Sequence, residues 1–170
     1  MVGYIKISNS KMKVYHYKTE QFLPTDINTA WHFFSSAKNL AKITPPELGF
    51  KILTNLDGRD IYEGMLIEYT VKPLFGIPLD WQTEIWKIKK PEMFTDKQLK
   101  GPYTIWEHTH EFIQQEKGIL MKDAVRYQLP FGIIGRMAHS LIVKQKIERI
   151  FNYRKEILNK IFTKNGNNII

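Results

Sequence analysis

The feature that most constrains the fold of this 170-residue chain is a two-residue periodicity of apolar side chains from Gly49 to Pro130. Side chains two positions apart on a strand point to the same face of a sheet, so the pattern predicts strands. Short turns, the last at Lys117-Gly118, divide it into six expected strands, at residues 50–54, 64–72, 79–87, 93–99, 103–114 and 119–129. Such short connections favour antiparallel neighbours, and six strands joined in this way form a sheet that curls.

Helices are expected on both sides of this stretch. A strand at residues 12–23 ends at Pro24, and Asp26 is a typical N-cap for a short helix. A second short helix is predicted at residues 37–43. Apolar residues at helical spacing then predict one long amphipathic helix near the C-terminus, marked by Val143, Ile147, Ile150, Phe151, Leu158 and Ile161.

The long helix must bury its apolar stripe. The only large apolar surface that the predicted elements offer is the concave face of the curled sheet. A helix that lies across a curved sheet seldom fills the space beneath it, so a cavity is expected between the two.

Composition indicates one folded domain, because 43% of the residues are hydrophobic and 25% are charged. We expect residues 1–11 to be an N-terminal extension, residues 12–163 to form the domain, and residues 164–170 to be a disordered tail. No apolar run approaches the roughly 18 residues of a membrane span, and no signal peptide is evident. These features predict a cytoplasmic protein without stable membrane insertion.

The chain is basic, with a formal net charge of +8. Much of this charge lies in residues 136–164, which hold eight basic and two acidic side chains. Such a segment is typical either of a protein that binds nucleic acid or an anionic membrane, or of the solvated face of one amphipathic helix. We favour the solvated face and expect no nucleic-acid partner, because no nucleic-acid-binding motif accompanies the charge.

The order of the elements and several motifs resemble the START-like (SRPBCC, or Bet v 1-like) helix-grip superfamily. The motifs that resemble its bacterial ligand-binding members are Gln21-Phe22-Leu23-Pro24, Asn39-Leu40-Ala41-Lys42-Ile43-Thr44-Pro45-Pro46, Leu74-Phe75-Gly76-Ile77-Pro78, Phe94, Asp96, Gln98, Gly101-Pro102-Tyr103, Trp106, His108, His110, Phe112, Asp123, Tyr127 and Pro130-Phe131-Gly132. The resemblance implies an α+β fold with a curved seven-stranded antiparallel sheet, two short helices after the first strand, and a long C-terminal helix across the concave face. Members bind lipids, sterols, hormones or polyketides, and some are cyclases or aromatases, so no single activity is implied.

The inner face of the predicted sheet is unusually polar. Alternation on the strand at 103–114 places Trp106, His108, His110 and Phe112 inside and predicts that they are less exposed than Glu107, Thr109 and Glu111. The polar residues expected on the concave side are Asp96, Gln98, His108, His110, Asp123 and Tyr127. They form either a self-satisfied network that braces the strands or a set that leaves some donors free for a ligand.

His108, His110 and Asp123 are the candidate catalytic residues, because a His beside an Asp in a partly apolar cavity can transfer protons. The same three offer a metal two nitrogens and a carboxylate, but this His spacing is common by chance. We therefore expect no metal and no cofactor. Arg154, on the apolar stripe of the last helix, either turns outward, pairs with Asp96 or Asp123, or binds an acidic ligand group.

The leading hypothesis is that the chain binds a small hydrophobic or amphiphilic molecule without catalysing a reaction. The expected ligand-binding residues are Trp31, Phe34, Tyr69, Trp81, Asp96, Gln98, Trp106, His108, His110, Phe112, Asp123, Val125, Tyr127, Ile147, Phe151 and Arg154. One alternative is a cyclase- or aromatase-like enzyme that uses an inner-face His/Asp pair on a polyketide or cyclic substrate. The other is a regulatory or interaction module that binds no ligand.

Overall fold

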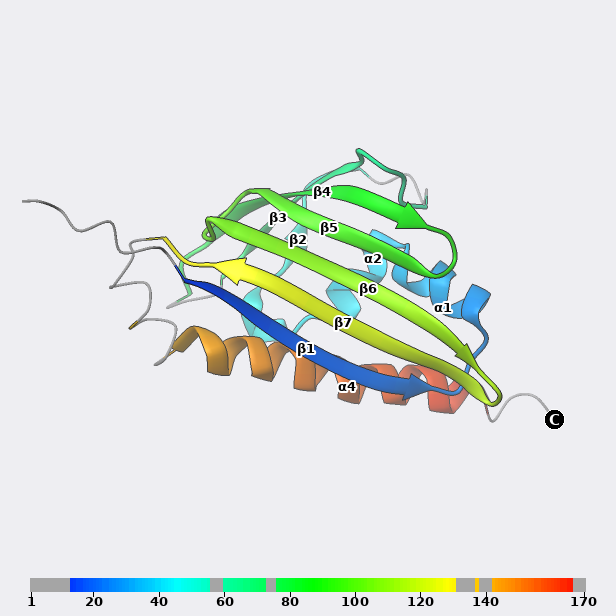
Figure 1. The fold of residues 1–170 in the computed structure, drawn as a ribbon. Coiled ribbons are helices and arrows are strands. Elements are labelled where there is room, and N and C mark those ends of the chain that lie inside the picture. Colours follow the sequence, from blue (N-terminus) through cyan, green and yellow to red (C-terminus); the bar gives the residue numbers. More distant parts are fainter. Residues whose placement is uncertain (1–12, 56–59, 73–75, 131–136, 138–141, 167–170) are drawn as a thin grey trace, which may run out of the picture.

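The computed structural model describes residues 13–55, 60–72, 76–130, 137 and 142–166 (Figure 1). Its elements in chain order are β1 (Val14–Leu23), α1 (Ile27–Phe34), α2 (Ala37–Lys42), the 3-10 helix η1 (Pro46–Leu48), β2 (Lys51–Ile52), β3 (Leu66–Val71), β4 (Leu79–Lys89), β5 (Met93–Lys100), β6 (Ile105–Gln115), β7 (Gly118–Gln128) and α4 (Lys144–Gly166).

The strands form one seven-stranded antiparallel sheet in the order β1-β7-β6-β5-β4-β3-β2. From β2 onward each strand pairs with the next in sequence, and β1 joins the sheet beside β7. Figure 1 shows the sheet curving over the helices, with α1 and α2 behind it and α4 running along β1. The predicted α+β architecture is confirmed.

Helix α1 begins where the sequence predicts it. The Asp26 carboxylate accepts hydrogen bonds from the backbone N–H groups of Asn28 and Thr29, at 2.9 and 3.0 Å, which satisfies two donors of the first turn. The helix buries Trp31, whose ring meets Phe94 and Phe112 edge-on at centroid distances of 5.9 and 6.2 Å. Helix α1 is therefore anchored to β5 and β6 by aromatic packing.

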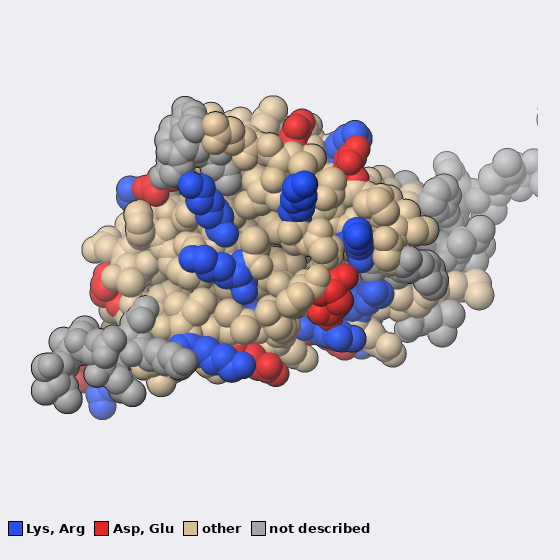
Figure 2. All heavy atoms as spheres, turned by 180° about the vertical axis from the view of Figure 1, so that it is seen from behind, with Lys and Arg blue, Asp and Glu red and all other residues tan. Residues whose placement is uncertain are grey.

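Helix α4 presents its apolar stripe to the sheet and Lys144, Arg149 and Lys160 to solvent, whereas Arg154 is buried. Two exposed basic residues form ion pairs, Arg149 with Glu47 at 2.8 Å and Lys144 with Glu148 at 3.9 Å. On the described part of the face in Figure 2, Lys and Arg are scattered among acidic and uncharged residues. This distribution supports the solvated-face interpretation of the basic segment.

The hairpin between β6 and β7 has a two-residue loop, Glu116-Lys117, because Gln115 pairs directly with Gly118. A Cβ atom on Gly118 would lie 2.3 Å from the backbone oxygen of Leu23, at the end of β1. Only glycine allows this close approach, so the position of the loop is coupled to the packing of β1.

Some boundaries differ from the expected ones. Strand β2 has two residues instead of the predicted 50–54, because the backbone N–H groups of Leu53 and Thr54 both donate to the Glu68 oxygen and the regular ladder ends there. Helix α4 continues to Gly166, beyond the expected domain end at 163. The predicted extension at 1–11 lies outside the described residues, as does the rest of the predicted tail. None of the described helices is both long and apolar enough to cross a membrane.

Candidate functional site

A cavity of about 360 Å³ lies between the sheet and the helices. Its wall is mainly apolar and comes from every layer of the fold, including Phe34, Leu40 and Ile43 near α1 and α2, Ile67, Trp81 and Ile85 on the sheet, and Ile147 and Phe151 on α4. The expectation of a space between helix and sheet is thus realised in the structure.

Ten of the sixteen residues predicted from the sequence line this cavity, namely Phe34, Tyr69, Trp81, Asp96, Trp106, His108, His110, Ile147, Phe151 and Arg154. The sheet residues among them belong to β3, β4, β5 and β6. The remaining six do not line it, and they are Trp31, Gln98, Phe112, Asp123, Val125 and Tyr127.

Five of these six residues are buried, and Gln98 is half-buried. Trp31 and Phe112 pack in the core between α1 and the sheet, and Val125 and Tyr127 pack in a cluster that includes Phe151 of α4. The concave face near β7 is therefore filled by helices, which corrects the expectation that its inward residues line the cavity. An inward side chain lines a cavity only where no helix covers it.

Gln98, one of the expected ligand-binding residues, is instead engaged with the backbone of Tyr103. Its side-chain amide donates to the backbone oxygen of Tyr103 at 2.6 Å and accepts from the N–H of the same residue at 3.3 Å. Both ends of the Gln98 amide are therefore used to close the turn between β5 and β6.

The predicted inner face of β6 is confirmed for three of its four residues. His108 and His110 are each 6% exposed and Phe112 is 2% exposed, whereas Glu111 is exposed. Trp106 is only half-buried because it borders the cavity, and its burial does not distinguish it from Glu107 and Thr109.

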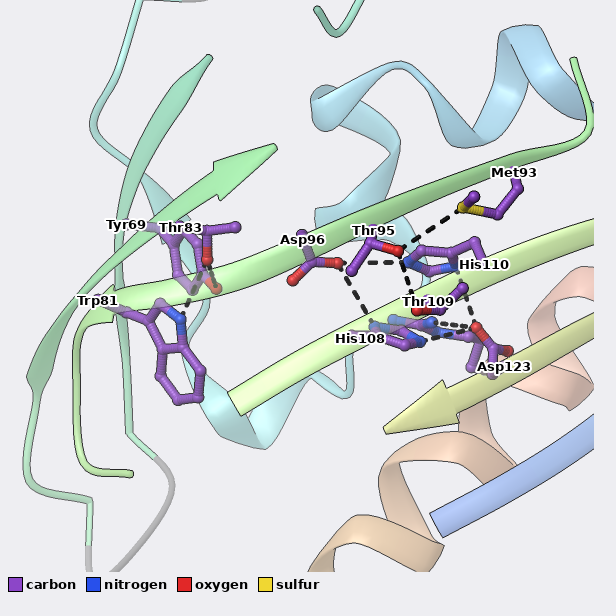
Figure 3. A network of polar contacts seen from close by, with 11 residues as sticks. Tyr69, Trp81, Thr83, Met93, Thr95, Asp96, His108, Thr109, His110 and Asp123 are labelled. Carbon is purple, nitrogen blue, oxygen red and sulfur yellow. Dashed lines mark hydrogen bonds and ion pairs between the residues drawn. The ribbon is translucent and has the colours of Figure 1, made fainter. Parts of the chain in front are cut away.

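Strand register brings two histidines and two aspartates together (Figure 3). Asp96 of β5 lies opposite His108 of β6, and His110 of β6 lies opposite Asp123 of β7. Directly opposed residues on one face of an antiparallel pair have adjacent side chains. We call Asp96, His108, His110 and Asp123 the His–Asp cluster.

Each imidazole of the His–Asp cluster lies between the two carboxylates. The Nε2 atom of His108 is 2.8 Å from Asp123 Oδ1, and its Nδ1 atom is 3.7 Å from Asp96 Oδ2. The Nδ1 atom of His110 is 3.0 Å from Asp123 Oδ1, without hydrogen-bond geometry, and its Nε2 atom is 3.5 Å from Asp96 Oδ2. Asp123 thus lies behind the imidazoles, and Asp96 lies on their cavity side.

Arg154 reaches the cluster from α4. Its Nη1 atom lies 3.5 Å from Asp123 Oδ1, so the structure supports the pairing with an inner carboxylate among the three interpretations of this residue. The side chain is 6% exposed, its Nε atom has no hydrogen-bond partner, and it borders the cavity. A buried guanidinium in this state retains hydrogen-bonding capacity for a ligand.

Burial and charge move the pKa values of the cluster in different directions. Burial and the neighbouring His110 lower the pKa of His108. Burial also lowers the pKa of His110, but its contacts with Asp123 and Asp96 outweigh this effect and the pKa is raised. Burial would raise the pKa of Asp123, yet the two imidazoles and the charge of Arg154 hold it well below its usual range. The environment therefore distinguishes two neighbouring imidazoles.

Comparison with solved structures identifies the fold. Norcoclaurine synthase from Thalictrum flavum, in complex with dopamine and hydroxybenzaldehyde, has a TM-score of 0.62 at 14% identity, over 94% of this chain and 95% of that chain. Ginseng major latex-like protein 151 from Panax ginseng has a TM-score of 0.63 at 11% identity, over 88% of this chain and 97% of that one. The chain has the Bet v 1-like (SRPBCC) helix-grip fold.

A third helix-grip structure is the di-domain ARO/CYC StfQ from the steffimycin biosynthetic pathway. Its TM-score is 0.69 at 8% identity, over 91% of this chain and 52% of that chain, so this chain spans about half of its length. No family model matches the sequence, and no curated protein matches it. At these identities, the likeness establishes the helix-grip fold and leaves function to the site.

Sequence reasoning missed a second polar group in the helix-grip cavity. The Thr83 hydroxyl accepts a hydrogen bond from the Trp81 indole N–H at 3.1 Å and lies 3.0 Å from the Tyr69 hydroxyl. All three line the cavity, on the opposite side of Asp96 from the two imidazoles in Figure 3. The signal was present in the alternation of β4, because Thr83 lies two residues after the inward Trp81.

Burial alters the acidity of tyrosines in the helix-grip core. It raises the pKa of Tyr69 and Tyr103 far above the usual range, and it raises the pKa of Tyr127 to about 12. Above pH ~10 the unfolded chain loses these phenolic protons while the folded chain keeps them. Stability present below pH ~10 must therefore fall as pH rises, at up to ~1.4 kcal/mol per pH unit for each tyrosine.

Replacing Tyr103 with Phe is expected to reduce this pH dependence. Urea unfolding between pH ~10 and ~11.5 should give a slope of the free energy of unfolding that is shallower by about 1.4 kcal/mol per pH unit than that of the wild type. The matched control is Tyr62→Phe, at a tyrosine that is 55% exposed. Equal slopes for Tyr103→Phe and the wild type would contradict the assignment.

Proposed function

We propose that this protein binds a small amphiphilic molecule in the helix-grip cavity. The observation that carries the proposal is an apolar cavity of about 360 Å³ with a buried charged group, Arg154 beside the His–Asp cluster, at its wall. Cavities of this size and composition are typical of small-molecule sites. In this proposal, as in the expectations from sequence, the protein acts in the cytoplasm and needs no nucleic-acid partner.

The apolar wall supports affinity and the charged group supports orientation. Burial of apolar ligand surface contributes about 25 cal/mol per Å² before entropic costs. A ligand without a polar group would leave the unpartnered Nε atom of Arg154 unsatisfied, whereas a carboxylate or carbonyl oxygen would accept from it. We therefore expect a ring system or short acyl chain that carries an oxygen acceptor.

A solved helix-grip structure offers a chemical precedent. The norcoclaurine synthase structure holds dopamine and hydroxybenzaldehyde, two small aromatic molecules with polar groups. Its identity to this chain is 14%, so it supports the class of ligand and not a particular compound.

The test is displacement of an environment-sensitive fluorophore by 2-naphthoic acid, 2-naphthol and naphthalene. We expect the acid to bind at least about tenfold more tightly than the hydrocarbon, which corresponds to about 1.4 kcal/mol. Arg154→Met removes the charge but keeps an unbranched apolar side chain, so it should abolish the preference for the acid while naphthalene still binds.

The matched control is Arg149→Met, on the outer face of the same helix, where the exposed arginine pairs with Glu47. This variant should keep the preference of the wild type. Equal affinities for acid and hydrocarbon in the wild type would refute an amphiphilic ligand, and failure of all three compounds to displace the fluorophore would refute a binding cavity.

The second candidate is an enzyme, and the His108–Asp123 pair favours it. Two adjacent imidazoles whose pKa values move in opposite directions provide one proton acceptor and one proton donor beside a cavity. Native mass spectrometry of the protein from its producing cell separates the candidates. A binder returns its copurified ligand unchanged after prolonged incubation, whereas an enzyme converts it, and His108→Phe keeps binding but loses conversion.

A further inference from the structure

We propose that Asp96, His108 and His110 bind a divalent metal ion, with Zn²⁺ as the expected occupant, and that its open coordination positions face the cavity. One ligand atom from each residue, two imidazole nitrogens and one carboxylate oxygen, lies within 4.8 Å of the other two. The expectation of no metal rests on the spacing of the two histidines, and the position of Asp96 is an observation that spacing does not contain.

Asp123 decides which nitrogens face this site. Its Oδ1 atom lies 2.8 Å from His108 Nε2 and 3.0 Å from His110 Nδ1. An ionised carboxylate only accepts hydrogen bonds, so the ring proton of a neutral His108 belongs on Nε2, which is hydrogen-bonded to Asp123, whereas His110 Nδ1 lies close to the same oxygen without hydrogen-bond geometry. His108 Nδ1 then presents its lone pair toward Asp96, and His110 Nε2 faces the same carboxylate.

One oxygen of Asp96 and one nitrogen of each imidazole therefore lie close together. Asp96 Oδ2 lies 3.7 Å from His108 Nδ1 and 3.5 Å from His110 Nε2, and among the described residues the structure records no other polar partner of the Asp96 side chain. Nitrogen and oxygen atoms that direct lone pairs at one another repel unless a cation lies between them. The two candidate cations are a metal ion and an additional proton on His110.

Two of the three separations are close to those expected around a metal ion, and the third is within 4.8 Å. Ligand atoms about 2.1 Å from a shared tetrahedral Zn²⁺ lie about 3.4 Å apart, close to both distances measured from Asp96. Two imidazoles and a carboxylate form a typical set of three protein ligands that leaves coordination positions open for water or substrate. Asp96, His108 and His110 all line the cavity, so those positions face it.

The surroundings also match those of metal sites. A metal-bound histidine usually donates its second N–H to a carboxylate, and Asp123 is hydrogen-bonded to His108 Nε2 at 2.8 Å. The same Asp123 oxygen lies 3.0 Å from His110 Nδ1, without hydrogen-bond geometry. With the metal bound, the charges of Asp96 and Asp123 oppose those of the ion and of Arg154, 3.5 Å from Asp123. Asp123 is therefore a positioning residue, which sets the tautomer of His108 and lies against the ring of His110.

This inference does not require the proposed organic ligand, because metal binding is measured on the protein alone. The test uses untagged protein stripped with EDTA and then titrated with ZnCl₂ or CoCl₂. Isothermal titration calorimetry and elemental analysis after dialysis should give about one Zn²⁺ per chain. Bound Co²⁺ should show visible d–d absorption with imidazole coordination.

The variants separate ligands from the positioning residue. Asp96→Asn and His110→Gln should each weaken Zn²⁺ binding by more than about 100-fold, whereas Asp123→Asn should weaken it by about 10–100-fold. The matched control is His32→Gln, at a surface histidine that lies 3.8 Å from Asp60. This variant should bind Zn²⁺ as the wild type does, and circular dichroism checks that every variant is folded.

Two results would overturn the proposal. The first is less than about 0.1 Zn²⁺ per chain in the wild type, which would leave a proton as the occupant between the imidazoles and Asp96. The second is unchanged Zn²⁺ affinity in folded Asp96→Asn, which would place the ion elsewhere. Neither result affects the displacement of fluorophore by naphthoic acid, so failure of the metal site is distinguishable from failure of the binding cavity.

Discussion

Replacing Asp123 with alanine is expected to lower the free energy of unfolding by about 3–5 kcal/mol. The carboxylate is 6% exposed and lies within 3.5 Å of His108, His110 and Arg154. Without it, the buried guanidinium and imidazoles lose their nearest acceptor, and an unpaired buried charge is costly. Urea unfolding in the presence of EDTA measures the change without a contribution from bound metal.

The control for this experiment is Asp80→Ala. Asp80 pairs with Lys100 at 3.3 Å, but both side chains are mostly exposed, so the expected loss is below about 1 kcal/mol. A loss below about 1 kcal/mol for Asp123→Ala as well would show that the His–Asp cluster does not hold the strands together.

Replacing Trp31 with alanine is expected to cost about 3–5 kcal/mol of stability. Trp31 is 3% exposed, and its edge-on contacts with Phe94 and Phe112 join α1 to β5 and β6. The truncation leaves a void that these rings cannot fill. Thermal and urea unfolding followed by circular dichroism measure the loss.

Trp86→Ala provides the matched comparison. Trp86 is 41% exposed on β4, where Lys87 and Lys97 lie over its ring, so its removal should cost less than about 1 kcal/mol. Similar losses for the two tryptophan variants would show that α1 is not anchored through Trp31.

The alternation of apolar and polar residues predicts most of the fold. Alternation is a local property, so the positions of the long strands, and the inward direction of His108 and His110, follow from neighbouring residues alone. The N-cap at Asp26 is likewise encoded by adjacent residues. Strand ends were less predictable, as at β2, because they depend on backbone bonds to a partner strand.

The contacts of the His–Asp cluster could not be predicted because they depend on register. A two-residue loop at Lys117-Gly118 would place Tyr127 opposite His108, whereas the actual loop, one residue earlier, places Asp123 opposite His110. Moving the loop by one residue along the chain thus changes the β7 residue that lies opposite each β6 residue by two positions. The site is specified by a turn and by the close contact of Gly118 with β1, far from the cluster itself.

The lining of the cavity was predictable only where sheet residues remain uncovered. Alternation places Val125 on the inner face as firmly as it places Trp106, but it does not tell which of the two a helix covers. That outcome depends on the path of α4 along β1, which is a property of the whole domain.

The His–Asp cluster comes from three neighbouring strands, whereas helices α1, α2 and α4 supply part of the apolar wall together with Arg154 and Lys146. The four ionisable groups of the cluster thus lie on strands that are separate from the helical part of the wall. Substitutions on the helices can remodel the volume offered to a guest molecule while the ionisable groups stay in place, and substitutions on β5 and β6 can do the reverse. In proteins with this arrangement, single substitutions can therefore change which ligand the cavity accepts while the fold is kept.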